Sequence, residues 1–239
     1  PKHRNIGYIP WDDDADIAML REDYERFKNV ASEMNHEICW FQDHDTDSEY
    51  RWGYGKLRRT NSVYIRVGQE HLKCKTGIFV DIFPMDDVPK SVLGQILQDI
   101  CCCCMRKILW SEVAKYNTKG LKRVLFLLLA KIPINIPFSV FNHYAKKSKN
   151  LSLNRVRCLS YPATGTLYKK NPLKERYSMP KKWFTERKEY DFEGKKFYSS
   201  DDYDTVLKYI YGEYMILPPE NARAQHSPFS EIRFPDEND

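Results

Sequence analysis

The chain has 239 residues, of which 42% are hydrophobic and 30% are charged. This globular composition excludes disordered, collagen-like and coiled-coil proteins. The 38 Lys and Arg against 33 Asp and Glu give a formal net charge of +5 at pH 7, a surplus too small to indicate a nucleic-acid-binding protein. No run of about 18 apolar residues is present that could cross a bilayer as a helix.

The hydrophobic pattern predicts a mixed succession of strands and helices. The expected elements, in chain order, are a helix over 20–35, a strand over 38–42, a hairpin over 51–67, a strand over 78–83 that Pro84 ends, helices over 92–116, 121–131 and 138–149, a hairpin over 191–198, and a helix over 201–211 that Ser199 or Ser200 caps. Beyond Pro219 we expect an irregular tail.

This order of elements predicts an α+β fold with a mixed β-sheet core. Residues 1–87 and 151–239 would form the core, and residues 88–150 a helical insertion or lobe. The sequence begins with Pro1 and not with Met, so we expect a truncated N-terminus.

Charge is distributed unevenly along the chain. Residues 1–60 contain 9 basic and 13 acidic side chains, whereas residues 146–188 contain 13 basic and 2 acidic ones. Carboxylates that hold a metal ion and cations that hold phosphate would produce this separation. A basic face exposed to solvent would produce it too, so charge alone leaves both interpretations open.

The seven cysteines do not form a metal or disulfide pattern. Four of them are consecutive, at positions 101–104. On a helix they would point in four directions and could neither converge on one metal ion nor pair with each other. The sequence therefore predicts free, buried thiols in a reducing compartment.

Four aspartates lie within five positions of the segment from Gly7 to Met19. In an extended strand, Asp14 and Asp16 would share one face, while Ala15 and Ile17 would face the core. Two neighbouring carboxylates repel each other unless a cation lies between them, and hard oxygen ligands suit Mg²⁺ or Mn²⁺. An acidic turn that caps the next helix is the alternative.

A further aspartate, Asp81, lies inside the apolar run 78–83. A buried carboxylate without a partner is costly, so we expect a metal held by Asp14 and Asp16 to lie beside Asp81. Three carboxylates in this arrangement are typical of metal-assisted phosphoryl or nucleotidyl transfer. The third one can bind the metal or accept the proton of an attacking hydroxyl.

Three segments together resemble the LicD family: IPWDDDADIAM at 9–19, FVDIFP at 79–84 and YGEYMILPP at 211–219. LicD proteins are phosphotransferases of cell-surface glycans, related more distantly to fukutin and fukutin-related protein. The resemblance implies a nucleotidyltransferase-like fold and Mg²⁺ or Mn²⁺ as cofactor. It assigns Asp14 and Asp16 to the metal-binding pair and Asp81 to the third carboxylate.

The resemblance also implies the partners. They are a CDP-choline-like nucleotide donor and a glycan or lipid-linked glycan acceptor, such as lipopolysaccharide, teichoic acid or capsule, and no nucleic acid. The implied location is the cytoplasm or the inner face of the cell membrane. A nucleotidyltransferase, a polyol-phosphate transferase on the same fold, and an inactive glycan-binding relative remain alternatives.

Four further residues are candidates for substrate binding. Lys56 and Arg58 share one strand face, and the resemblance places them near the donor phosphates, with a solvated strand face as the alternative. Arg223 and His226 follow the Pro-Pro segment, where the family often has an arginine and a histidine. A tail folded over the site could use them, and a surface tail is the alternative. The family's Gly-rich turn ahead of the aspartates is missing from this chain.

Two features stay open in the same way. Aromatic residues near the predicted site, namely Trp11, Trp40, Trp52 and Tyr54, could line a pocket for the quaternary ammonium of choline, or they could be core residues. Residues 119–131 combine basic and apolar side chains. They would form either a peripheral contact with a membrane surface or a core helix with a basic edge.

Overall fold

The computed structural model describes residues 14–31, 33–34, 36–149, 154–162, 177–217, 219–220, 223 and 228–235. The strands are β1 (Asp16–Leu20), β2 (Cys39–Gln42), β3 (Gly55–Arg59), β4 (Val63–Arg66), β5 (Phe79–Asp87), β6 (Arg155–Arg157), β7 (Met179–Pro180), β8 (Arg187–Phe192), β9 (Lys195–Ser200) and β10 (Phe229–Arg233). The helices are α1 (Arg21–Ala31), α2 (Val92–Asn117), α3 (Gly120–Leu129), α4 (Asn135–Ser148), α5 (Lys182–Thr185) and α6 (Tyr203–Tyr211).

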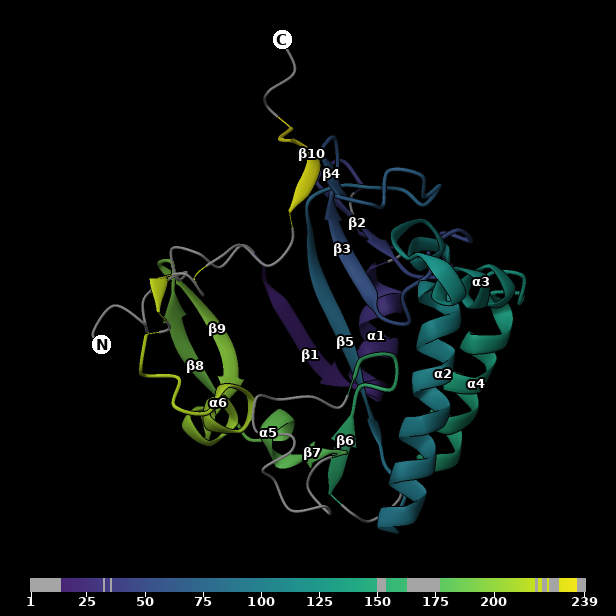
Figure 1. The fold of residues 1–239 in the computed structure, drawn as a ribbon. Helices are drawn as coiled ribbons and strands as arrows, with labels where there is room; N and C mark the ends of the chain where they lie inside the picture. The colour runs from purple at the N-terminus through teal and green to yellow at the C-terminus, as the bar shows by residue number, and fades with distance from the viewer. Residues whose placement is uncertain are drawn as a thin grey trace.

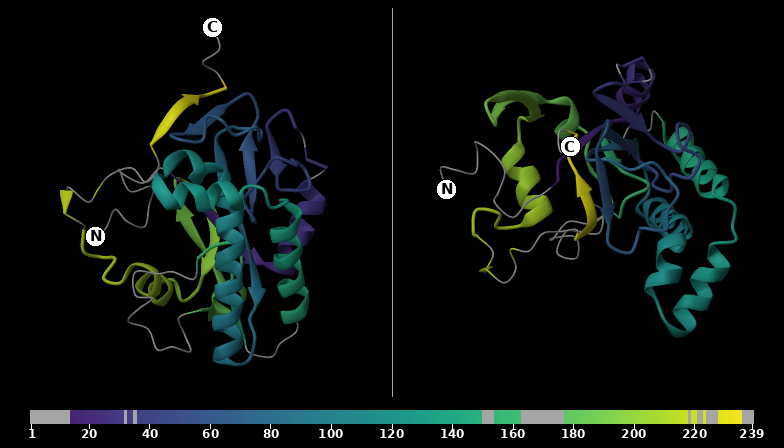
Figure 2. Two further views of the ribbon diagram at one scale, coloured as in Figure 1. Left: turned by 45° about the vertical axis from the view of Figure 1, so that its right-hand side comes forward. Right: turned by 90° about the horizontal axis from the view of Figure 1, so that it is seen from above.

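The architecture is mixed α/β, as expected, with one main sheet of six strands. The path β2-β3-β5-β6-β7 is antiparallel, and β1 pairs with β5 in parallel. Helices α2–α4 and the β8–β9 hairpin lie on opposite sides of this sheet (Figures 1 and 2). Strand β5 therefore has β1 and β3 as direct neighbours, which determines the surroundings of Asp81.

Two apolar clusters hold the helices to the sheet. The cluster under α2 and α4 contains Cys102, Leu109, Phe138, Phe141 and Leu159. The cluster under α1 contains Tyr24, Ala31, Phe41 and Ile82. Ile17 belongs to neither, because 46% of its surface is exposed, so the expectation that it faces the core is wrong.

The hairpin expected over residues 51–67 is also wrong. Strands β3 and β4 both form in this segment, but they do not pair with each other. β3 lies between β2 and β5, whereas β4 pairs with β10 from the tail in a separate two-stranded sheet. The tail after Pro219 is therefore not entirely irregular. Alternating hydrophobicity predicts a strand but cannot tell which strand will pair with it.

Strand β5 continues through Pro84 to Asp87, four residues beyond the predicted end at Phe83. Proline is accepted in a strand where no neighbour needs its missing N–H. Pro84 is the register partner of Met19 on β1, but the Asp81 N–H that donates to the Ala15 carbonyl on that side places the nitrogen of Pro84 on the opposite edge. On that edge Pro84 lies between the stretch that pairs with β3 (79–82) and the stretch that pairs with β6 (86–87).

The helix predictions are confirmed with shifted ends. Helix α4 begins at Asn135 and places Pro137 in its first turn, where a missing N–H costs no intrahelical bond. Ser199 and Ser200 lie in β9 and do not cap α6. The residue at that cap is Asp202, whose side chain makes no capping hydrogen bond.

All seven cysteines are free thiols. The consecutive cysteines on α2 point in different directions, as predicted, because Cys102 is buried while Cys104 is exposed. The expectation that the thiols are buried is correct for Cys102 but not for the others. In the described part of the chain, no helix is both long and apolar enough to cross a membrane.

Candidate active site

Three of the residues predicted from sequence form a row across three neighbouring strands. Asp16 on β1 is the register partner of Asp81 on β5, and Asp81 is the register partner of Lys56 on β3. Register partners on adjacent strands project their side chains to the same face of a sheet. The structure therefore brings Asp16, Asp81 and Lys56 together.

Tyr161 packs beside the strand that carries Asp81. Its ring lies 5.2 Å from Phe83, which follows Asp81 on β5 by two residues. Burial raises the pKa of the Tyr161 phenol, and the negative charges of Asp16, Asp14 and Asp81 raise it further. One phenol thus experiences the electrostatic field of all three aspartates. Asp12 and Asp13 lie outside the described residues.

The partner of Asp81 in this structure is Lys56. The two side chains form an ion pair and are 9% and 5% exposed. The sequence analysis expected a metal ion to compensate this buried carboxylate, whereas Lys56 compensates it here. Burial lowers the pKa of Lys56 to about 7, the charge of Asp81 acts in the opposite direction, and nearby Arg58 lowers it further.

Three cations surround the ring of Phe79 on β5. Lys56 Nζ lies 3.3 Å from the ring centroid, and the Cζ atoms of Arg58 and Arg66 each lie 5.3 Å from it. Arg58 is buried, donates to the Gln42 side chain, and donates to the Gly77 carbonyl at 2.6 Å. Burial lowers the pKa of Arg58. Within the described residues, neither Arg58 nor Arg66 forms an ion pair with a carboxylate.

A cavity of about 80 Å³ opens beside these cations. Its walls include Lys56, Arg58, Arg66 and Lys75, together with the aromatic rings of Trp52 and Phe79. The Nε of Arg66 is buried and has no hydrogen-bond partner within the described part of the chain. A small cavity with several cations and an unsatisfied N–H donor is suited to an anionic oxygen group such as phosphate.

The tail pairs with β4, the strand whose residues Tyr64, Ile65 and Arg66 line this cavity. Strand β10 pairs with β4 so that Phe229 is the register partner of Arg66. Arg223 lies a few residues before β10, and its main-chain N–H donates to the Glu220 carbonyl at 3.1 Å. His226 lies outside the described residues. The roles of Arg223 and His226 in substrate binding therefore stay predictions.

The described aromatic candidates for a choline pocket lie in or next to the cation cavity. Trp52 lines the cation cavity, and Trp40 contacts Lys75, whose Nζ lies 5.3 Å from the ring. Tyr54 is buried, and its ring centroid lies 4.5 Å from that of Phe83. Trp11 lies outside the described residues. The rings that are described thus contact the protein's own side chains.

Some cations of the basic segment 146–188 form ion pairs with the protein's own carboxylates. Arg157 pairs with Asp99 at 2.7 Å, and Lys181 pairs with Asp87 at 3.1 Å. Lys169, Lys170, Lys174 and Arg176 lie outside the described residues. The described cations of this segment therefore serve internal ion pairs as well as any contact with an anionic substrate.

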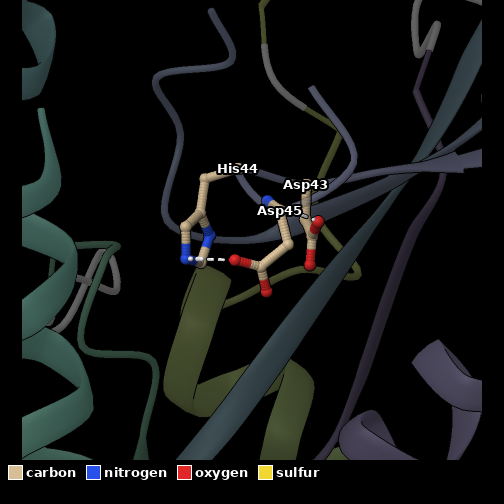
Figure 3. Close-up of side chains that lie close together, drawn as sticks. All are labelled: Asp43, His44 and Asp45. Atoms are coloured by element: carbon tan, nitrogen blue, oxygen red, sulfur yellow. Dashed lines mark hydrogen bonds and ion pairs between the residues drawn. The ribbon is translucent and has the colours of Figure 1, made fainter. Parts of the chain in front are cut away.

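A second carboxylate cluster, Asp43, His44 and Asp45, follows β2 (Figure 3). Among the described residues, the three ligand atoms of this cluster all lie within 4.8 Å of one another. Those of Asp14, Asp16 and Asp81 do not lie that close together. Lys28 already pairs with both Asp43 and Asp45. Asp43 also accepts the main-chain N–H groups of Asp45 and Thr46 at 2.9 and 3.0 Å. These bonds explain the cluster as a structural turn.

The sequence analysis did not find Arg66, Lys75 or Tyr161. Arg66 ends an ordinary strand pattern, and Lys75 and Tyr161 lie in loops, so no local motif distinguishes them. Their relevance follows from strand pairing and from the cavity. The sequence offers one signal for such a binding residue, a charged side chain at the end of a predicted strand. That signal applies to Arg66 and not to Lys75 or Tyr161.

Comparison with known proteins gives two matches. The sequence model of the family described as "LicD/FKTN/FKRP, nucleotidyltransferase domain" matches residues 2–126. The chain is 27% identical over 230 residues to the "Lipopolysaccharide cholinephosphotransferase LicD" of Haemophilus influenzae. The aligned region covers 93% of this chain and 81% of that protein. No solved structure matches the chain significantly.

Proposed function

This chain belongs to the LicD family, and from that premise we propose that it is a metal-dependent phosphotransferase. It transfers phosphocholine, or a similar phospho-alcohol, from a CDP-linked donor to a hydroxyl of a cell-surface glycan. The name of its relative in Haemophilus influenzae supports both the transferred group and lipopolysaccharide as the class of acceptor. The observation that carries the proposal is the row of Asp16, Asp81 and Lys56 across β1, β5 and β3.

The donor set fits a hard divalent cation. Asp14, Asp16 and Asp81 offer only carboxylate oxygens, which Mg²⁺ and Mn²⁺ prefer. The negative charges of all three raise the pKa of the same Tyr161 phenol, which supports assigning them to one site. These three residues would hold the ion, which would neutralise charge that develops on the transferred phosphoryl group.

The protein's own cations would bind and orient the donor. Lys56, Arg58 and Arg66 converge on Phe79 beside the cavity, where guanidinium N–H groups can bind phosphate oxygens. Their positive charge favours a phosphoryl group next to Asp81. Asp81 would accept the proton of the attacking glycan hydroxyl.

The test measures CMP release from CDP-choline in the presence of Mg²⁺, with a glycan acceptor and without one. We expect Asp16→Asn and Asp81→Asn each to reduce turnover by about 10²-fold or more, since each removes a charge required at the reacting phosphate. Asp191→Asn is the matched control, because Asp191 is an exposed aspartate on the β8–β9 hairpin. Wild-type turnover in both site variants would show that the site is wrong.

Other donors separate the alternatives. Activity with CDP-glycerol or CDP-ribitol but not with CDP-choline would indicate a polyol-phosphate transferase. Release of pyrophosphate from CTP would indicate a nucleotidyltransferase. Glycan binding without turnover of any donor would indicate an inactive relative.

A further inference from the structure

Helix α3 has an apolar face that none of the described residues buries. None of its residues is buried. Five large apolar side chains are exposed, at 89% for Leu121, 53% for Val124, 51% for Leu125, 44% for Leu127 and 58% for Leu128. Leu121, Val124, Leu125 and Leu128 have the i, i+3, i+4, i+7 spacing of one helix face. We refer to these five residues as the α3 apolar face.

The same segment is strongly basic. Between Thr118 and Pro133 the charged residues are Lys119, Lys122, Arg123 and Lys131, and no acidic residue is present. All four are exposed, and no ion pair within the described part of the chain includes any of them. Lys119 and Lys131 bracket the helix at its two ends, and Lys122 and Arg123 lie on its first turn.

We propose that α3 binds in the plane of an anionic lipid bilayer. A helix that combines an apolar face with basic side chains inserts the face at the boundary of headgroups and acyl chains, while its cations contact the anionic headgroups. Ten residues of helix span about 15 Å, half of the hydrocarbon core, so the helix lies on the bilayer and does not cross it. This inference does not depend on the proposed enzymatic function.

Charge complementarity favours a lipid surface over a second copy of the chain. A dimer formed through the α3 apolar face would bring two segments with four unpaired cations each into contact. Like charges that face each other oppose association. An anionic bilayer offers an apolar layer and negative charge together, which matches both properties of α3.

The position of α3 leaves its apolar face accessible. The helix packs along α2, and its half-buried residues are Phe126 and Leu129. Figures 1 and 2 show α3 at the periphery of the helical layer, on the side away from the β8–β9 hairpin. A flat surface can therefore approach α3 without displacing another element.

The experiment is co-sedimentation of the full chain with vesicles. One preparation contains phosphatidylcholine alone, and the other contains phosphatidylcholine mixed with phosphatidylglycerol. We expect binding to the mixed vesicles only, and we expect added salt to weaken it. The double variants Leu125→Asn/Leu128→Asn and Lys122→Gln/Arg123→Gln should each reduce binding by about 10-fold or more.

The matched control is Leu93→Asn/Leu97→Asn on α2. These two leucines are also exposed, at 65% and 56%, but they do not belong to the basic α3 segment. The control should bind mixed vesicles like the wild type. Far-UV circular dichroism and the melting temperature of every variant verify that it is folded, which is expected because all substituted side chains are exposed.

Three results would overturn the proposal. The first is a wild-type chain that does not bind mixed vesicles. The second is an equal loss of binding in the α2 control and in the α3 variants. The third is a dimer, detected by light scattering, that becomes monomeric in Leu125→Asn/Leu128→Asn while the wild type binds no vesicles, since a second copy would then cover the face.

Discussion

At the residue scale, Arg66 differs from the other cations of the candidate site. Lys56 has Asp81, and Arg58 has Gln42 and the Gly77 carbonyl. The Nε of Arg66 is buried and finds no hydrogen-bond partner among the described residues, although burial of an unsatisfied donor costs free energy. An anionic ligand in the adjacent cavity would satisfy it, so Arg66 is the residue with which the phosphate hypothesis is tested most directly.

We predict that Arg66→Gln weakens donor binding more than it slows the chemical step. A hydrogen bond to a charged group contributes about 1.5–3 kcal/mol, so the KM for CDP-choline should rise about 10-fold or more, with a smaller change in kcat. Arg187→Gln is the control, because Arg187 also lies over an aromatic ring, 6.0 Å from Tyr198, but on the β8–β9 hairpin. An unchanged KM in Arg66→Gln would show that the cavity does not bind the donor.

The sequence identifies the residues of the row and two cations of the cavity, Lys56 and Arg58, but not Arg66 or Lys75. Polar residues in apolar strands need partners, and residues two apart on a strand share one face. These two rules single out Asp14, Asp16, Asp81, Lys56 and Arg58. The contribution of Arg66 depends on which strand lies beside β4, and that of Tyr161 on a loop packed against β5. These are long-range contacts, which local patterns do not encode.

At the scale of elements, β3 depends on a close approach that only glycine permits. A Cβ added at Gly55 would lie 2.4 and 2.5 Å from two ring carbons of Phe41 and 2.9 Å from the Tyr24 hydroxyl. Phe41 lies on β2, and Tyr24 on α1. Because Gly55 has no side chain, the start of β3 can pack closely against Phe41 of β2 and Tyr24 of α1, next to Lys56.

We predict that Gly55→Ala destabilises the protein by about 1–3 kcal/mol, because the added methyl group overpacks this junction. Urea unfolding measures the change as a lower midpoint at an unchanged slope. The control is Gly120→Ala, which has open space around the added Cβ but a φ of +59°, so that its cost of about 1 kcal/mol arises from the backbone alone. Equal stability of Gly55→Ala and the wild type would contradict this packing argument.

The elements also show what pattern reasoning cannot supply. The strands expected over 51–67 do form, but β4 pairs with β10, which lies more than 160 positions later in the chain. Strand β5 passes Pro84 because β3 and β6 both leave that position unpaired on one edge, while β1 continues to pair on the other. Local sequence determines whether a segment forms a strand or a helix. Which strand pairs with it, and where it ends, depend on which other strands can form main-chain hydrogen bonds with it.

At the scale of the whole molecule, His44 joins the sheet to the helical layer. It lies in the turn after β2, and its ring stacks on Phe138 of α4 with 3.9 Å between the ring centroids and 8° between the planes. Asp45 lies 3.3 Å from Nε2. The contact connects two regions that the sequence analysis assigned to the core and to the helical insertion.

Burial lowers the pKa of His44 below its ordinary value of 6.5, while Asp45 and Asp43 act to raise it and Lys28 and Arg21 lower it further. The folded protein therefore binds this proton more weakly than the unfolded chain, and protonation favours unfolding. The stability contributed by neutral His44 is present above about pH 6.5 and decreases as the pH falls below that value.

We therefore predict that the free energy of unfolding increases between about pH 5.5 and pH 7.5 and that His44→Gln removes part of this increase. Urea unfolding of both proteins at each pH measures the effect, and subtraction of the two pH profiles cancels the other titrating groups that they share. The variant also loses a ring contact, which shifts its stability by a similar amount at both pH values and so does not alter the difference in slope. Identical pH profiles for the two proteins would show that the stack of His44 on Phe138 does not couple the sheet and the helical layer to protonation.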